Sequence, residues 1–160
     1  MNDSYDRGGA TNYGITQSTY SQWLGRRASV AEIRAMNVDT AKEIYLNYYY
    51  KPRINGLPVP TQPQIFYCAI NHGSRRAIKF VQTVCNLAGF GPVEIDGVNG
   101  PLTMGAVDIA FEIMGNYFIN AIADERISFF NAIIKKDSSQ ERFIDGWLKR
   151  AETYRLPLGL

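Results

Sequence analysis

A glycine-rich segment near the start of the chain, YDRGGATNYGIT at Tyr5–Thr16, most limits the folds open to this sequence. The adjacent glycines Gly8 and Gly9 permit positive φ angles, as a tight hairpin turn requires. The run that follows, from Asn12 to Thr16, alternates polar and apolar side chains. No comparable alternation longer than a few residues occurs elsewhere, so this segment is the one candidate for β structure. We therefore expect a small β-hairpin at the N-terminus of an otherwise helical protein.

Helical patterns fill most of the remaining sequence. Thr16 can cap a short helix that runs through Trp23, and two tetrapeptides, SVAE at Ser29–Glu32 and SSQE at Ser138–Glu141, have the capping-box pattern. Proline-rich and turn-rich stretches at 51–63 and 88–101 predict loops. Further helices are predicted at residues 39–50, 63–71, 75–88, 102–115, 117–136 and 139–154. The predicted fold class is mainly α, with a small N-terminal β-hairpin.

Composition excludes several classes of protein. A chain of 160 residues suits one compact domain or two small lobes. With 17 basic and 15 acidic residues, the charge is too balanced for a general nucleic-acid binder. No apolar run approaches the ~20 residues of a membrane span. No signal peptide is visible, so we expect a cytoplasmic protein. Cys68 and Cys85 lie in apolar helical segments, and we expect reduced, buried thiols there.

The glycine-rich segment has two interpretations on its residues alone. The hairpin can be purely structural and lead into the first helix. Alternatively Asp6, Thr11 and the bare glycine backbone form a polar wall beside a cleft, where a polymeric ligand can approach the main chain closely.

Five blocks of the sequence resemble one family in the same order along the chain. Asp6–Thr16 is similar to the block D-x-G-G-x-T-x-x-G-I-T of bacterial and phage murein hydrolases, the N-acetylmuramidases of glycoside hydrolase family 108, some once labelled secretion activators. The other blocks are YYYKPRINGLP at Tyr48–Pro58, FYCAINHG at Phe66–Gly73, AIKFVQ with IDGVNGPLTMGAV at Ala77–Val107, and ERFIDGWLKR at Glu141–Arg150. The resemblance implies a lysozyme-like catalytic lobe at residues 1–60, without its first helix, and a helical peptidoglycan-binding lobe at 61–160 packed on it.

The resemblance also implies a reaction, hydrolysis of the β-1,4 bond between N-acetylmuramic acid and N-acetylglucosamine. Such cleavage normally uses one protonated carboxyl group and one carboxylate. By analogy with phage-type lysozymes, Asp6 orients the attacking water and Thr11 is its hydroxyl partner. The glutamate that serves the family as general acid precedes this aspartate, and its position falls upstream of Met1. We therefore expect the chain as written to be poorly active. Asp3 is less well placed than Asp6, and Glu32 and Glu43 are expected to cap a helix and to face solvent.

Substrate contacts are implied by the same resemblance. The expected residues are Gly8, Gly9, Tyr13, Thr16, Tyr49, Asn71 and Asp96. Some have a structural alternative: three consecutive tyrosines on a helix point in three directions, so at least one of Tyr48–Tyr50 belongs to the core. Asn71 can cap its helix instead, and Asp96 lies in a turn before a helix. The single histidine, His72, has no partner for a triad or a zinc site, and no metal or cofactor is expected.

The partner implied by the resemblance is peptidoglycan, which a hydrolase made in the cytosol reaches through a holin or another release route, as in phage or prophage lysis. The expected localisation is cytoplasmic until release to the periplasm or cell wall. Nucleic acid is not an expected partner. The alternative function is a non-catalytic protein that binds peptidoglycan or assists secretion, and the absent glutamate is the feature that separates the two.

Overall fold

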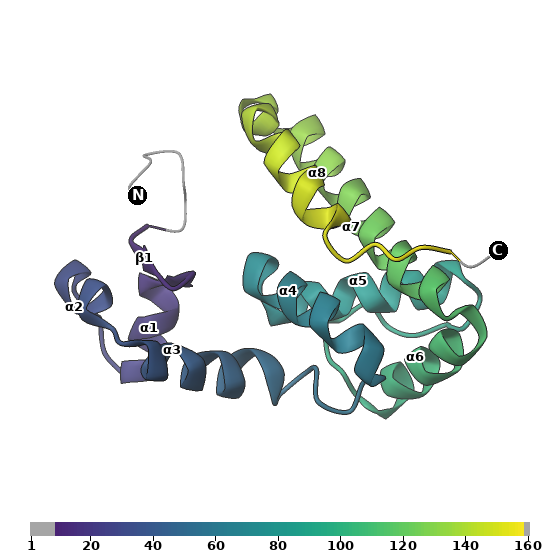
Figure 1. The fold of residues 1–160 in the computed structure, drawn as a ribbon, viewed down its shortest axis with the longest axis horizontal. Helices are drawn as coiled ribbons and strands as arrows, with labels where there is room; N and C mark the ends of the chain where they lie inside the picture. Colours follow the sequence, from purple (N-terminus) through teal and green to yellow (C-terminus); the bar gives the residue numbers. More distant parts are fainter. Residues whose placement is uncertain (1–8, 159–160) are drawn as a thin grey trace. The chain divides into compact units, whose positions relative to one another are not determined.

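The computed structural model describes residues 9–158. Within this range lie eight α-helices, one two-stranded antiparallel sheet and shorter 3₁₀ and π segments (Figure 1). The mainly α fold with a small N-terminal hairpin is thus confirmed. The chain forms two compact units, Met1–Pro52 and Arg53–Leu160. The functional roles predicted for the lobes 1–60 and 61–160 stay predictions.

The hairpin of the first unit consists of β1 (Thr11–Asn12) and β2 (Ile15–Thr16). Thr11 pairs with Thr16, and Asn12 pairs with Ile15. The turn lies at Tyr13 and Gly14, whose φ angles of 50° and 76° are both positive, as a type I′ turn requires. A Cβ on Gly14 would lie 2.8 Å from the Tyr45 hydroxyl, so glycine is also needed for space. The sequence suggested Gly8-Gly9 for this turn, but the turn lies within the alternating run from Asn12 to Thr16.

Three helices follow the hairpin, each started by a polar side chain. Thr16 caps α1 (Gln17–Leu24) as predicted, and its hydroxyl accepts a hydrogen bond from the Thr19 N–H. The predicted capping box at Ser29–Glu32 starts α2 (Val30–Ala35) and is confirmed. Asn37 caps α3 (Val38–Ile44). Their apolar faces enclose a small core, formed by Ile15, Ile33, Met36, Ala41 and Ile44.

The end of α3 widens into a π-helical segment, Tyr45–Tyr50, where the sequence predicted a continuous helix. Aromatic contacts accompany the change: the Tyr48 ring meets Trp23 edge-on at 5.6 Å, and Tyr45 and Tyr49 lie 5.3 Å apart. Tyr45, Tyr48 and Tyr49 all pack against the core of the first unit. The tyrosine run therefore serves packing in part, as its three directions predicted.

The second unit is a helical assembly around one aromatic and aliphatic core. The elements are a 3₁₀ turn (Val59–Thr61), α4 (Gln62–His72), α5 (Ser74–Leu87), α6 (Pro101–Met114), α7 (Asn116–Lys136), a 3₁₀ segment (Ser138–Phe143) and α8 (Ile144–Glu152). The amphipathic α5 contacts α4, α6 and α7, and α8 lies along α7 (Figure 1). Fully buried side chains such as Ile78, Phe118 and Ile122 fill the centre. Cys68 and Cys85 are buried free thiols, as expected.

The predicted helix at 139–154 is wrong in its first five residues, 139–143. Asp137, rather than Ser138, provides the cap: its carboxylate accepts from the backbone N–H of Ser139 at 3.1 Å. The following residues form a 3₁₀ segment, and α8 begins only at Ile144. An acid one position earlier thus replaces the predicted SSQE box, since aspartate is as good an N-cap as serine.

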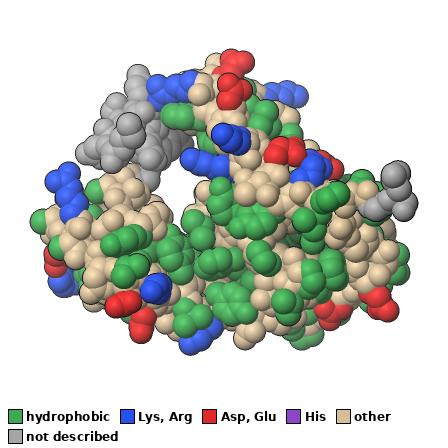
Figure 2. All heavy atoms as spheres, viewed as in Figure 1, with side chains coloured by type: hydrophobic (Ala, Val, Ile, Leu, Met, Phe, Trp, Pro, Cys, Tyr) green, Lys and Arg blue, Asp and Glu red, His purple; other side chains and the backbone are tan. Residues whose placement is uncertain are grey.

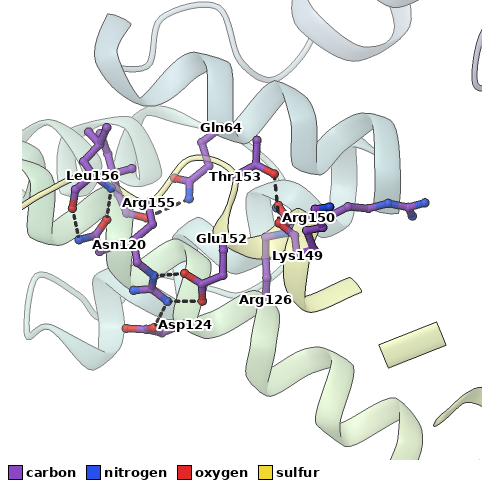
Figure 3. Close-up of polar contacts among 11 residues, drawn as sticks. Gln64, Asn120, Asp124, Arg126, Lys149, Arg150, Glu152, Thr153, Arg155 and Leu156 are labelled. Carbon is purple, nitrogen blue, oxygen red and sulfur yellow. Dashed lines mark hydrogen bonds and ion pairs between the residues drawn. The ribbon is translucent and has the colours of Figure 1, made fainter. Parts of the chain in front are cut away.

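The residues after α8 are held against α7 by polar side chains (Figure 3). The Asn120 side chain donates to the Leu156 carbonyl at 2.9 Å and accepts from the Leu156 N–H at 2.8 Å. The Arg155 guanidinium reaches both Asp124 and Glu152. These contacts hold the tail in place on the second unit.

Hydrophobic side chains remain at the surface between scattered charges, on the face drawn in Figure 2. Exposed hydrophobic side chains of α6 include Leu102, Ile109 and Ile113, which are 82%, 53% and 70% exposed. No helix within residues 9–158 is long and apolar enough to span a bilayer.

Candidate functional site

The hairpin leaves one of its polar side chains available. Asn12 donates to the carbonyls of Ile33, Arg34 and Met36 and so secures the end of α2. The Thr16 hydroxyl is occupied as the cap of α1. Thr11 is exposed, and its hydroxyl has no hydrogen bond within residues 9–158. Because cross-strand partners share a face, Thr11 lies with Thr16 on the side opposite the buried Ile15.

Tyrosines support the turn of the hairpin. The Tyr45 hydroxyl donates a hydrogen bond to the Tyr13 carbonyl, and burial raises the Tyr45 pKa, with a further contribution from Tyr49. Tyr13 itself is 51% exposed. Gly9 is also exposed, with a positive φ of 66°. The candidate residues Gly9, Thr11, Tyr13, Thr16 and Tyr49 thus all lie in the first unit, whereas Asp6 and Gly8 fall outside the described residues.

The acids that the structure describes in the first unit have other roles. Glu32 closes its capping box and pairs with Arg26, which lowers the Glu32 pKa to about 2, with help from the hydrogen bonds of Ser29. Asp39 is in the first turn of α3 and Glu43 is exposed on the same helix. The lowered pKa of Glu32 is the opposite of what a general acid needs near neutral pH, and Asp39 and Glu43 are exposed on a helix rather than buried among apolar neighbours.

In the second unit, Asp96 belongs to a loop organised by a buried glutamine. Gln82 is 1% exposed, and its amide nitrogen donates to Asp96 Oδ1 at 2.9 Å, to the Val98 carbonyl and to the Thr103 hydroxyl. The Gln82 oxygen accepts from the Gly97 N–H. Asp96 also accepts from the Val98 N–H, and these bonds, the one from Gln82 first, lower its pKa. The carboxylate therefore shapes this loop, DGVNG at Asp96–Gly100, which we call the Gln82 loop.

Gly97 is required at the centre of this loop. Its φ is +78°, and a Cβ would lie 2.3 Å from Arg75 Cγ and 2.6 Å from the Arg75 carbonyl oxygen. Arg75 Nε in turn donates to the Asp96 carbonyl at 2.8 Å. A shallow pocket of about 180 Å³ lies beside the loop, with Asp96 among its lining residues.

Asn71 lines a different pocket, of about 130 Å³, at the end of α4. Its side chain donates to the Tyr67 carbonyl one turn earlier, at 2.9 Å. The Arg126 pocket, as we name it, is lined by side chains that include Asn71, His72, Arg126, Phe130, Trp147 and Arg150. Asn71 and Asp96 are therefore not neighbours in one site, although both were expected to contact substrate.

Arg126 was missed at the level of sequence. It is fully buried on α7, in register with Ile119, Ile122, Ala123 and Phe130. Residues spaced i, i+3, i+4, i+7 and i+11 share one face of a helix, and here that face is otherwise apolar. An arginine on an apolar face was therefore the signal in the sequence that could have identified this buried charge. The other charged residues of the segment are at least partly exposed.

Among the described residues, no three His, Cys, Asp or Glu side chains gather as a metal site would require. His72 is instead enclosed by Phe80, Phe129 and Phe130.

The sequence matches two family models that together cover most of the chain. Residues 1–73 match the model for glycosyl hydrolase 108, and residues 76–152 match a predicted peptidoglycan domain. The solved structure of SagA from Brucella abortus is 32% identical, with a TM-score of 0.81 over 97% of this chain and 82% of the SagA chain. The chain belongs to the glycosyl hydrolase 108 family. No curated protein matches the sequence.

Membership of the glycosyl hydrolase 108 family makes this a peptidoglycan-related protein, with peptidoglycan as its partner. The match to the hydrolase model covers the hairpin, the tyrosine segment and α4. The match to the peptidoglycan domain covers the Gln82 loop and α6 to α8.

Proposed function

We propose that this protein is a peptidoglycan hydrolase of the muramidase type, which cleaves the β-1,4 bond between N-acetylmuramic acid and N-acetylglucosamine. The observation that supports it best is the Thr11 hydroxyl, which no described residue engages although its neighbours Asn12 and Thr16 are both bonded. A free hydroxyl on an exposed strand next to a glycine-rich backbone suits a role toward a ligand better than a role in the fold.

In this proposal the reaction uses a pair of carboxyl groups, as glycoside hydrolysis normally does. Asp6 orients the attacking water, and Thr11 anchors that water or the carboxylate through a hydrogen bond. The general acid is a glutamate outside the described residues, because Glu32, Asp39 and Glu43 are each engaged or exposed elsewhere. In this proposal the residues from Met1 onward supply Asp6 and Thr11 but not the general acid, and release to the murein depends on a holin or another route.

The test is a murein-clearing assay on two proteins, the chain that begins at Met1 and a chain extended by the residues encoded in frame before it. We expect clearing only by the extended protein, and loss of clearing when an upstream glutamate is changed to Gln. Within the extended protein, Asp6→Asn should lower turnover by roughly 10²-fold or more, because a general acid–base group contributes on that order. Rapid clearing by the Asp6→Asn protein would show that this aspartate takes no part in the reaction.

The engaged acids of the first unit also support a second candidate, a non-catalytic peptidoglycan-binding or secretion-accessory protein. This candidate predicts that neither protein clears murein while both sediment with it. Activity in the extended protein would eliminate it.

A further inference from the structure

The second unit buries a cation for which the described residues provide no counter-ion. Arg126 is 0% exposed, and its guanidinium makes one hydrogen bond, from Nη1 to the Arg150 carbonyl at 3.2 Å (Figure 3). Its Nε and Nη2 atoms have no partner among the residues described. Arginine stays protonated in proteins, and an uncompensated buried charge destabilises the folded state. The fold therefore keeps a guanidinium with two open donors in its interior.

Aromatic rings account for only part of this arrangement. The Arg126 guanidinium carbon lies 5.5 Å from the Tyr67 ring centroid and 5.9 Å from that of Phe130. Such contacts stabilise the charge but do not use the N–H donors, which lie in the plane of the guanidinium. The two donors remain available for a planar acceptor.

Positive charge and further open polar atoms gather around the same point. The buried Nε2 atom of the half-buried His72 also lacks a partner among the described residues. Besides burial, the positive charges of Arg126, Arg76 and Arg150 keep this imidazole neutral. No Asp or Glu lines the Arg126 pocket, and none within residues 9–158 forms an ion pair with Arg126 or Arg150. The pocket is thus positive and rich in donors.

We propose that the Arg126 pocket binds the terminal carboxylate of a peptide, with the stem peptide of peptidoglycan as its source. Carboxylates match the arginine fork in geometry and charge. The remaining walls, Phe130, Ile133 and Trp147, suit a small apolar substituent beside that carboxylate, such as the methyl group of alanine. The pocket volume of about 130 Å³ is several times the ~10–15 Å³ that one water needs, so a terminal residue can enter. The choice of stem peptide rests on the peptidoglycan-related function, and the carboxylate chemistry rests on the pocket.

Entry requires a side chain at the rim to turn aside, because Arg126 Nε and Nη2 are covered. Asn71 and Arg150 are exposed residues of the rim and can rotate without loss of core packing. The bond that positions Arg126 is to the Arg150 main chain, so rotation of the Arg150 side chain leaves the guanidinium in place.

The experiment is isothermal titration calorimetry of the full chain with N-acetyl-L-Lys-D-Ala-D-Ala and with the C-terminal amide of the same peptide. We expect the acid to bind at least tenfold more tightly than the amide. Arg126→Met should lose this preference, whereas Lys149→Met, which removes a charge from exposed α8 outside the pocket, should keep it. Acetate and phosphate are titrated separately, because they distinguish a site for free small anions from a site for a peptide end.

Folding of the Arg126→Met protein is checked by its melting temperature. If that variant does not fold, the wild-type protein labelled with ¹⁵N-arginine provides the measurement, since the buried Arg126 Nε–H resonance should shift with the acid and stay unchanged with the amide. Equal binding of acid and amide, an unshifted resonance, or tighter binding of acetate or phosphate than of the peptide each overturns the proposal. No step depends on hydrolysis, so the result is independent of the muramidase assignment.

Discussion

At the scale of single residues, the hairpin offers a pair of threonines with the same chemistry and different expected roles. Thr16 is a helix cap, and Thr11, its cross-strand partner, has a hydroxyl that no residue within 9–158 engages. In the extended, active protein, Thr11→Val should reduce murein clearing and leave the melting temperature unchanged. Thr16→Val should instead lower the stability by about 1 kcal/mol, because the cap of α1 is lost. Clearing rates and thermal melts of both variants check this, and normal clearing by Thr11→Val would remove Thr11 from the site.

His72 should make stability depend on pH. Burial, followed by the charges of Arg126, Arg76 and Arg150, lowers its pKa to about 3 from an ordinary value near 6.5. Above pH 6.5 the imidazole is mostly neutral in both the folded and the unfolded chain, so it adds little pH dependence to the stability. Below that pH the unfolded chain binds a proton that the folded chain refuses, so stability falls progressively until about pH 3. Between pH 7 and pH 5 the expected loss is roughly 2 kcal/mol.

The comparison for this prediction is His72→Phe, which keeps an aromatic ring among Phe80, Phe129 and Phe130. Urea unfolding at pH 7 and pH 5 should give a large difference for the wild type and a small one for the variant. Since the chain contains one histidine, no other imidazole contributes in this range. If the free energy of unfolding changed equally between pH 7 and pH 5 in the two proteins, His72 would be protonated in the folded state.

At the scale of elements, local signals predicted two of three helix caps correctly and missed the π segment. Thr16 and the box at Ser29–Glu32 were found because each cap is a contact within four residues. The box at Ser138–Glu141 failed because Asp137 competes for the same N–H groups from one position away. The π segment at Tyr45–Tyr50 has no local signal, since its partners Tyr13 and Trp23 are more than twenty residues distant.

The Gln82 loop gives a prediction with a matched control. Gly97→Ala should destabilise the second unit by about 1–3 kcal/mol or more, because the added methyl meets the Arg75 main chain and the positive φ disfavours a side chain. Gly100→Ala, three residues later in open space and at a φ of −86°, should be nearly neutral. Chemical unfolding of both proteins separates the two cases, and a neutral Gly97→Ala would mean that the loop is free to rearrange.

At the scale of the whole molecule, the sequence indicated the family but not which of the predicted site residues lie together in one pocket. The order of the five blocks was enough to indicate glycoside hydrolase family 108, whose membership is now shown. The predicted contacts Asn71 and Asp96 lie at separate pockets of the second unit, because adjacency there depends on how α4, α5 and the 88–100 loop pack. Arg126 was overlooked because it is charged and stands on an apolar face.

Sedimentation with peptidoglycan and murein clearing should respond differently to a substitution at Asp96. Asp96→Ala removes the acceptor of Gln82 and Val98, so it should lower the stability of the second unit and reduce sedimentation with purified peptidoglycan only in proportion to unfolding. In the extended protein it should not abolish turnover. Sedimentation and clearing are measured below and near the melting temperature. Complete loss of turnover by folded Asp96→Ala protein would place this carboxylate in the chemistry.

The attachment of the tail to α7 determines how far the protein can be shortened. Asn120 is 7% exposed and directs both ends of its amide at Leu156, while Arg155 joins Asp124 to Glu152. A stop codon in place of Arg155 leaves the Asn120 amide without its Leu156 partner in the interior. A stop codon after Leu158 keeps every one of these contacts. Carboxypeptidase digestion should accordingly pause near Leu156, which gives mass spectrometry a natural marker for correctly folded material.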